Sequence, residues 1–172
     1  MSDVPGRFAD LLRDIEIPYP WERDTFVSAV GRHRGRPIRL QPVEDPALLS
    51  GVGCGTTTSG LWIKTTHADI VLYFADTEWH ADHVISHEIG HMLLGHDEEG
   101  AADGGPADRL PLHELMPSLS PDAIKCALGR NDYSSERETA AETFADLLMV
   151  EAALPRRRPS VARRTLFRTR HR

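Results

Sequence analysis

The spacing of apolar and polar residues divides the chain into helical and extended segments. Apolar residues recur every three or four positions in four segments, which predicts helices over residues 5–15, 21–34, 79–94 and 135–154. Alternation with a period of two predicts strands over 37–43, 61–66 and 70–75, the last two joined as a hairpin. A short helix is expected between Pro121 and Leu128. This order of elements predicts an α+β fold in which a small antiparallel or mixed sheet packs on helices.

The composition is that of a soluble globular protein. The chain has 172 residues, of which 40% are hydrophobic and 27% charged, and we expect one domain over residues 1–155. No run approaches the roughly 18 apolar residues of a membrane span, and the first twenty residues do not resemble a signal peptide. Cys54 and Cys126 stand outside any CxxC pattern, so we interpret them as reduced thiols. These features predict a cytoplasmic protein that has no membrane partner.

Charge is distributed unevenly between the main body and the C-terminal segment. Residues 156–172 hold eight arginines and no acidic residue, so this predicted tail carries +8 and the rest of the chain −14 of the net −6. Such a tail could contact nucleic acid or an acidic partner, or stay solvated. The strongly acidic body argues against nucleic acid as the main partner of the protein.

The feature with the clearest chemistry is His87-Glu88-Ile89-Gly90-His91, an HExxH pattern inside the predicted 79–94 helix. Histidines four residues apart lie on neighbouring turns of one helix face, a spacing that suits two nitrogen ligands of one tetrahedral Zn²⁺. Glu88 projects between them, where its carboxylate would act as general base on a water molecule that zinc activates. We therefore predict His87 and His91 as metal ligands and Glu88 as the catalytic residue.

Zinc requires a third protein ligand, and the last helix supplies the best candidates. Glu138 falls closer than Glu142 to the centre of that helix's apolar stripe, which comprises Ala141, Ala145, Leu148 and Ala152. A carboxylate on a buried face is costly unless it is paired or bound to metal. Glu138 is therefore the predicted third ligand, and Glu142 would orient a ligating imidazole. Two alternatives stay open: Glu142 as the ligand, and Glu138 in a capping box with Ser135.

Other polar residues have weaker claims to a role. His96 follows His91 by five residues, one short of the metzincin spacing, so we interpret it as a surface residue or one that supports a ligand. His83, one turn before His87, would line the cleft or serve a structural role. Tyr133 and His113 are candidates to stabilise a developing oxyanion.

The residues of the two motifs together are similar to those of a known family. The block VISHEIGHMLL at 84–94, followed by Glu138-x-x-Ala141-x-x-Phe144-Ala145, resembles the ImmA/IrrE family of metallopeptidases over roughly residues 20–150. The resemblance implies a zincin-like, gluzincin-type site with Glu138 as third ligand. It also implies a hydrolase that cleaves a helix-turn-helix repressor of the XRE type and thereby regulates transcription. The chain departs from the family at Ala140-Ala141-Glu142, where an acidic residue followed by Ala-Asn is usual.

The leading prediction is thus a zinc-dependent endopeptidase. The alternative is a non-catalytic regulator, or toxin component of a toxin–antitoxin pair, that binds an XRE-type partner. The intact Glu88 favours catalysis, because a purely structural metal site needs no general base. An extended substrate commonly pairs with an edge strand beside the helix that carries HExxH, and we expect residues 70–75 to form that edge.

Overall fold

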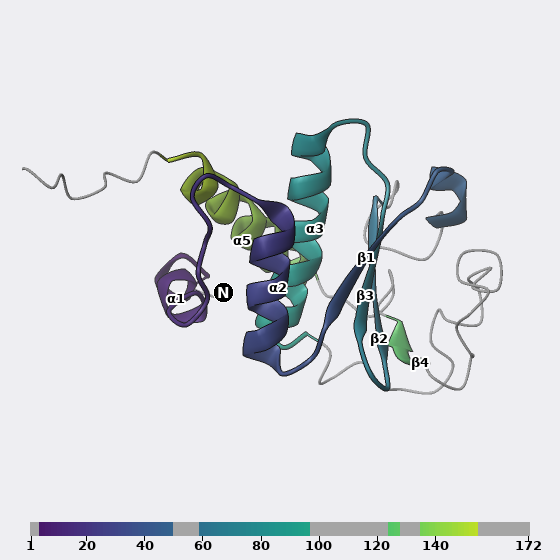
Figure 1. Cartoon of the computed structure of the whole chain (residues 1–172), viewed down its shortest axis with the longest axis horizontal. Coiled ribbons are helices and arrows are strands. Elements are labelled where there is room, and N and C mark those ends of the chain that lie inside the picture. The colour runs from purple at the N-terminus through teal and green to yellow at the C-terminus, as the bar shows by residue number, and fades with distance from the viewer. Residues whose placement is uncertain (1–3, 50–58, 97–123, 128–134, 155–172) are drawn as a thin grey trace, which may run out of the picture.

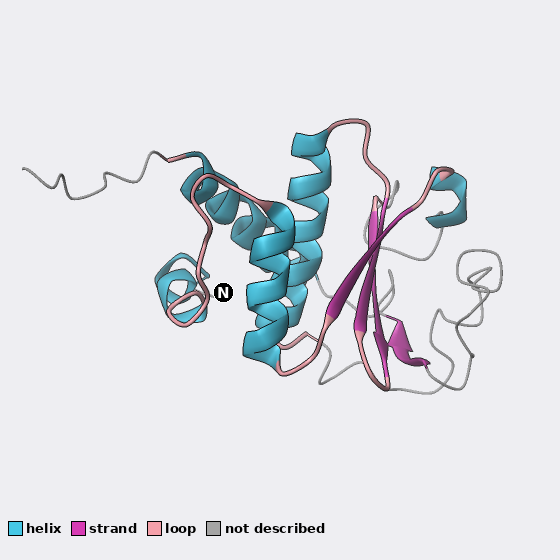
Figure 2. Cartoon of the chain, in the orientation of Figure 1, coloured by secondary structure: helices cyan, strands magenta, loops and turns pink. Residues whose placement is uncertain are grey.

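Helices and a small sheet form separate layers in the computed structural model of the chain, which describes residues 4–49, 59–96, 124–127 and 135–154. Along the chain the elements are α1 (Val4–Leu11), α2 (Arg23–Arg34), β1 (Ile38–Pro42), the 3-10 helix η1 (Pro46–Leu49), β2 (Gly60–Thr65), β3 (Asp69–Tyr73), α3 (Glu78–Leu93), β4 (Ile124–Ala127) and α5 (Ser135–Ala153). Figures 1 and 2 show the long helices gathered on one side of the sheet. The predicted α+β class is confirmed.

The sheet is mixed. Its described strands follow the order β1-β3-β2-β4, with β1 parallel to β3 and β2 antiparallel to both of its neighbours. β1 follows α2 in the chain and lies next to β3, on the side of the β2–β3 hairpin away from β2 (Figure 1). In this position β1 runs parallel to β3. Of the two predicted alternatives, antiparallel and mixed, the structure selects mixed.

β3 is an interior strand, so the prediction that residues 70–75 form the substrate-binding edge is wrong. β3 pairs with β1 on one side and with β2 on the other. Both sets of its backbone hydrogen-bonding groups are therefore used within the sheet, and an additional strand has no place to pair. The period-two pattern correctly identified the strand but held no information about its neighbours.

The predicted short helix ending at Leu128 is also wrong, because residues Ile124–Ala127 form β4. This strand pairs antiparallel with the second half of β2, from Ile63 to Thr65. A run of four residues is too short for its periodicity to separate helix from strand, so pairing with β2 decides its conformation.

Local signals explain where the central helices begin and end. α2 ends at Gly35, whose φ of 67° lies in the left-handed region that favours glycine. α3 begins after Thr77, whose hydroxyl oxygen accepts a hydrogen bond from the backbone N–H of His80 at 3.1 Å. The 79–94 helix predicted from periodicity is thus observed as Glu78–Leu93.

The hydrophobic core lies between the sheet and the helices. α2 and α3 contact the sheet, and α5 packs on α3 from the other side together with α1 (Figure 1). The largest fully buried side chains come from all of these layers and include Trp62, Phe26, Phe144, Ile85 and Ile89. Because α3 contacts β2 and β3 of the sheet and also α5, this helix is held on both sides.

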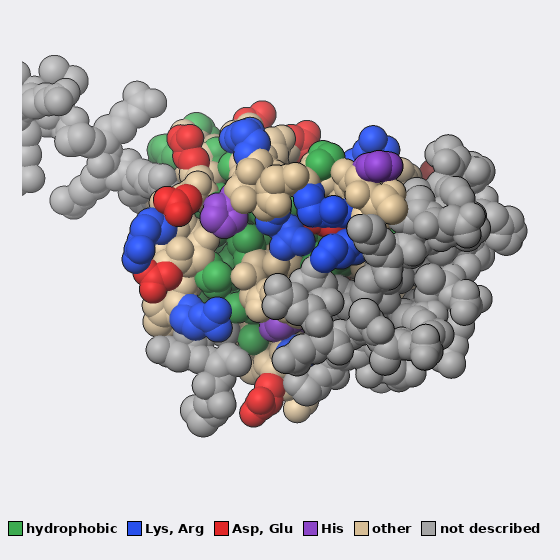
Figure 3. All heavy atoms as spheres, turned by 90° about the horizontal axis from the view of Figure 1, so that it is seen from below, with side chains coloured by type: hydrophobic (Ala, Val, Ile, Leu, Met, Phe, Trp, Pro, Cys, Tyr) green, Lys and Arg blue, Asp and Glu red, His purple; other side chains and the backbone are tan. Residues whose placement is uncertain are grey.

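An ion-pair cluster ties the end of α3 to the sheet. Asp69 is fully buried at the start of β3 and lies 3.2 Å from Arg34 and 3.5 Å from Arg36. Arg34 also donates a hydrogen bond to the carbonyl of Met92, in the last turn of α3. Lys and Arg side chains gather in the middle of the face seen in Figure 3. The cluster fixes the last turn of the HExxH helix relative to the strands.

Several predictions concern residues outside the described part of the chain. Tyr133 and His113, the candidates for oxyanion stabilisation, both lie there, as does the Arg-rich segment 156–172. Within the described residues, no helix has the length and apolar character needed to cross a membrane.

Candidate metal centre

The site is built where α3 and α5 approach each other closely. A Cβ atom added at Gly90 would lie 3.1 Å from the carbonyl oxygen of Ala141 and 3.1 Å from the ring of Phe144. Both distances are at the tight end of van der Waals contact, so any side chain at position 90 would push the helices apart. Gly90 and Ala141 therefore allow polar side chains of the two helices to reach one another.

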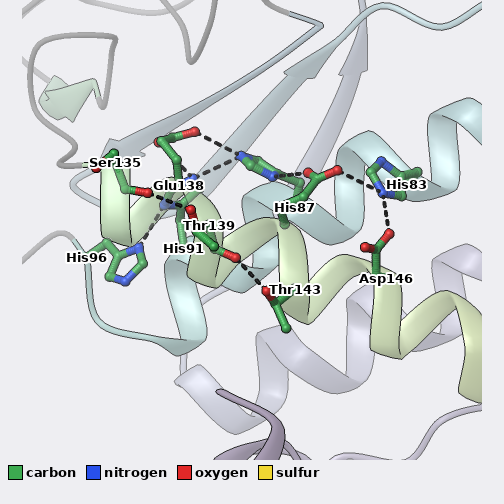
Figure 4. A network of polar contacts seen from close by, with 10 residues as sticks. His83, His87, His91, His96, Ser135, Glu138, Thr139, Thr143 and Asp146 are labelled. Atoms are coloured by element: carbon green, nitrogen blue, oxygen red, sulfur yellow. Dashed lines mark hydrogen bonds and ion pairs between the residues drawn. The ribbon is translucent and has the colours of Figure 1, made fainter. Parts of the chain in front are cut away.

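Three histidines of α3 face three carboxylates of α5 along the helix pair. The two helices run antiparallel, so each step of one turn back along α3 is matched by a step of one turn forward along α5. The resulting pairs are His91 with Glu138, His87 with Glu142, and His83 with Asp146. Figure 4 shows His91, His87 and His83 one after another along α3, with Glu138 at one end of the row and Asp146 at the other. A spacing of four residues on both helices keeps all six groups on facing stripes. We call this arrangement the His–carboxylate ladder.

The inner end of the ladder brings together His87, His91 and Glu138, the three predicted ligands. The Nε2 atoms of the two histidines are 3.0 Å apart. One carboxylate oxygen of Glu138 lies 3.6 Å from His87 Nε2, and the other lies 3.5 Å from His91 Nε2. One donor atom from each residue thus falls within 4.8 Å of the others, a grouping that can hold a metal ion.

The donor set fits a tetrahedral cation. Metal–ligand bonds of about 2.0–2.1 Å at tetrahedral angles place ligand atoms about 3.3 Å apart, which is between the separations observed here. Glu138 Oε1 is buried and has no hydrogen-bond partner within the described part of the chain. A buried carboxylate oxygen without a partner is costly, and coordination of a cation would remove that cost.

Each candidate ligand imidazole has a polar partner on its other nitrogen. His87 Nδ1 lies 3.1 Å from Glu142 Oε2, and His91 Nδ1 lies 2.8 Å from His96 Nδ1. A proton on Nδ1 of each ligand would be donated to these partners and leave the Nε2 lone pair free for a metal. Glu142 thus occupies the predicted orienting position.

His96 reaches His91 because the chain turns back at the end of α3. Gly95 adopts a φ of 72°, and the backbone N–H of His96 donates to the carbonyl of His91 at 3.1 Å. The side chain of His96 is buried against the imidazole that it supports. Of the two alternatives for His96, the structure therefore excludes a surface residue and places its ring against His91, a predicted ligand.

The alternative role for Glu138, a capping box with Ser135, does not match the observed helix. α5 already includes Ser135, whereas a capping box requires the serine to precede the first helical residue. Glu138 is directed at the two histidines (Figure 4). Its side chain is 30% exposed, compared with 53% for Glu142, in agreement with the predicted position nearer the buried stripe.

The electrostatics of the inner group favour a protonated His87 beside a neutral His91. Burial and the neighbouring His87 lower the pKa of His91, so this imidazole is neutral and able to coordinate. Burial opposes the charging of His87, but hydrogen bonds to Glu138 and Glu142 outweigh it and raise its pKa to about 10. A metal ion binding here must therefore displace a proton from His87.

Glu88 lies beside the ligands and is almost fully buried, with 3% of the residue exposed. Burial raises the pKa of its carboxyl to about 7, against the opposing effects of nearby His87 and of a hydrogen bond from the backbone N–H of Trp62. A carboxyl whose pKa lies near neutrality can both accept and release a proton at physiological pH.

Gly60 is a part of the site that sequence reasoning missed. A Cβ atom at this position would lie 2.7 Å from Glu88 Oε1 and 2.8 Å from a methyl group of Val84. Only glycine leaves room for the Glu88 carboxylate against the start of β2. The sequence contained no signal for this, because a glycine at the end of a loop is normally interpreted as a turn residue.

Comparisons of the chain with family models, with curated proteins and with solved structures gave no match.

Proposed function

We propose that the chain is a zincin-like, zinc-dependent endopeptidase whose metal ligands are His87, His91 and Glu138 and whose general base is Glu88. One observation carries the proposal: three donor groups converge within 4.8 Å of one another, directly beside a buried carboxyl whose pKa is near neutrality. A site that only held a metal for stability would not need an additional ionisable group next to it.

The two imidazoles and the Glu138 carboxylate would hold the ion, and Glu142 and His96 would fix the rings. Two neutral nitrogens and one carboxylate are ligands typical of catalytic zinc. Bound Zn²⁺ would act as a Lewis acid that polarises the scissile carbonyl and makes water more acidic.

Glu88 performs the proton transfers. Its carboxylate takes a proton from a water molecule as the water oxygen attacks the carbonyl carbon of the peptide bond. The same group then delivers this proton to the departing amine nitrogen, so that the C–N bond breaks and the base is restored. The hydrogen bond from Trp62 and the close contact with Gly60 hold the carboxylate in position during both steps.

The first half of β2 is the proposed binding edge for substrate. Ser59 and Thr65 bond to the β3 side, so the backbone groups of Gly60 and Trp62 point to the opposite side, where the N–H of Trp62 donates to Glu88. Within the described residues, β4 covers only Ile63–Thr65 of that edge. An extended peptide that added to residues 60–62 would bring its backbone next to the general base.

The proposed substrate is a helix-turn-helix repressor of the XRE type. Support for this comes from the resemblance of the residues 84–94 and 138–149 to the ImmA/IrrE metallopeptidases. The observed packing of these two segments against each other is compatible with that resemblance, since both motifs contribute to one site.

Metal analysis combined with a cleavage assay tests the proposal. The chain, purified without chelator, is expected to contain tightly bound zinc and to cleave an XRE-type helix-turn-helix repressor. Glu88→Gln keeps the shape of the side chain but removes the base, so zinc should remain while cleavage falls by at least about 10³-fold. Glu151→Gln, at an exposed position of α5, is the matched control and should cleave normally.

Two results would contradict the mechanism. Cleavage by Glu88→Gln at the rate of the unmodified chain would exclude Glu88 as the base. Tight binding of the partner by both proteins without cleavage by either would favour the non-catalytic regulator.

A further inference from the structure

The outer end of the His–carboxylate ladder holds a second group of metal-ligating side chains that the proposed catalysis does not use. His83 Nε2 lies 3.3 Å from Asp146 Oδ1 and 3.6 Å from Glu142 Oε1. One donor atom from each residue lies within 4.8 Å of the others, as at the inner end. These separations match those of ligand atoms around one transition-metal ion.

We propose that His83, Glu142 and Asp146 form a second, weaker site for a divalent transition-metal cation, one turn along the α3–α5 groove from the inner site. The proposal does not require that the chain be a peptidase.

The ligand chemistry defines the class of cation. One imidazole nitrogen and two carboxylate oxygens suit borderline metals such as Zn²⁺, Co²⁺ or Mn²⁺, whereas Mg²⁺ and Ca²⁺ prefer sites made only of oxygen. Glu142 and Asp146 together carry a charge of −2 when ionised, which a divalent cation would balance. His83 is 27% exposed, Glu142 53% and Asp146 68%, so water can complete the coordination.

The geometry indicates why this site binds more weakly than the inner one. The exposed side chains must lose conformational freedom when they bind, while the inner ligands are already held by packing. The two sites are four residues apart on α3, which is about 6 Å along the helix axis. Two divalent ions at that distance repel each other, so the second ion binds against the charge of the first.

Glu142 connects the two sites. Its Oε2 contacts Nδ1 of His87, a proposed ligand of the inner ion, and its Oε1 faces His83. A cation at the outer site would be coordinated by Glu142, the same carboxylate that contacts the imidazole of His87. Occupation of the outer site is therefore coupled to the inner site through one side chain.

Titration of the metal-free chain with Co²⁺, followed by visible absorption and calorimetry, tests the proposal. We expect two equivalents, the second bound at least about tenfold more weakly than the first. His83→Gln and Asp146→Asn should each lower the affinity for the second equivalent by at least about tenfold and retain the first. His80→Gln, one turn earlier on the same helix, is the matched control and should bind both.

His91→Gln separates this proposal from the proposed function, because it removes an inner ligand and should abolish only the tight equivalent. Both outer substitutions lie at partly or largely exposed positions, and circular dichroism verifies that the variants are folded. Binding of a single equivalent by the unmodified chain would overturn the proposal. So would a second equivalent that persists unchanged in both outer variants, or that Mg²⁺ displaces as readily as Co²⁺ does.

Discussion

The two ends of the His–carboxylate ladder use nearly the same side chains but differ in what surrounds them. At the inner end, His91 is fully buried, a buried Glu88 lies alongside, and Glu138 Oε1 is buried without a hydrogen-bond partner among the described residues. At the outer end, Asp146 is 68% exposed and water can satisfy each polar atom. Burial converts the same ligand chemistry into a strong requirement for a cation at one end and a weak one at the other.

The difference also concerns reactivity. Beside the inner end, the buried carboxyl of Glu88, which is not a proposed ligand, is held between α3 and the start of β2 by contacts with Gly60 and Trp62. In the proposed mechanism, the two facing helices supply the candidate metal ligands, and the contribution of the sheet would assign proton transfer to the inner site.

The largest expected effect comes from removing the carboxylate of the inner end. Glu138→Gln leaves a neutral and weaker ligand, so affinity for the first Co²⁺ equivalent should fall by more than the roughly 10–100-fold that loss of a supporting contact costs. Glu136→Gln, an exposed position two residues earlier in α5, should bind normally. Equal affinities in the two variants would show that the third ligand is a different residue, and Glu142→Gln would be the next variant to measure.

The next effect is on stability, and it should be present at the inner end alone. The pKa of Glu88 is raised from 4.5 to about 7 in the folded chain, so its ionisation opposes folding increasingly from pH 4.5 upward and fully above pH 7. Glu88→Gln should therefore stabilise the metal-free chain by on the order of 3 kcal/mol at pH 8 and by very little near pH 4.5. Denaturant unfolding at both pH values measures this gain.

A smaller effect is expected from disturbing the position of Glu88. Gly60→Ala places a methyl group against the carboxylate and must displace it, so kcat/KM for peptide cleavage should fall by about 10²-fold while zinc content is retained. Ser59→Ala tests the neighbouring position without adding a side chain against Glu88. Full activity of Gly60→Ala would mean that the observed carboxylate position is not the catalytic one.

The smallest effect concerns the packing that both ends share. Gly90→Ala gains about 1 kcal/mol of helix propensity but must separate α3 from α5, at a cost of about 1–3 kcal/mol. We expect net destabilisation of about 1 kcal/mol and weaker binding of both Co²⁺ equivalents. A variant that is more stable than the unmodified chain, with both affinities unchanged, would show that close helix contact is not needed for the ladder.

Sequence reasoning succeeded where a single element determines the result. His87, Glu88 and His91 are neighbours on one helix, so periodicity alone placed them together. For the same reason, the apolar stripe of the last helix correctly predicted that Glu138 is less exposed than Glu142. Sequence reasoning failed where pairing with a strand from a distant part of the chain determines the structure. Residues 124–127 were expected to be helical but form β4, and β3 was expected to be an edge strand but is an interior one.

The sequence by itself determined the ligand types, their spacing and the two helices that carry them, because these follow from covalent order and helical periodicity. Only the tertiary structure decided that the two helices align in register, that Gly60 makes room for Glu88, and that His96 turns back onto His91. Those features depend on distances between segments far apart in the chain, and local pattern carries no information about such distances. The pairing of His83 with Asp146 belongs to the same group, since neither residue gains a role until α3 and α5 are packed.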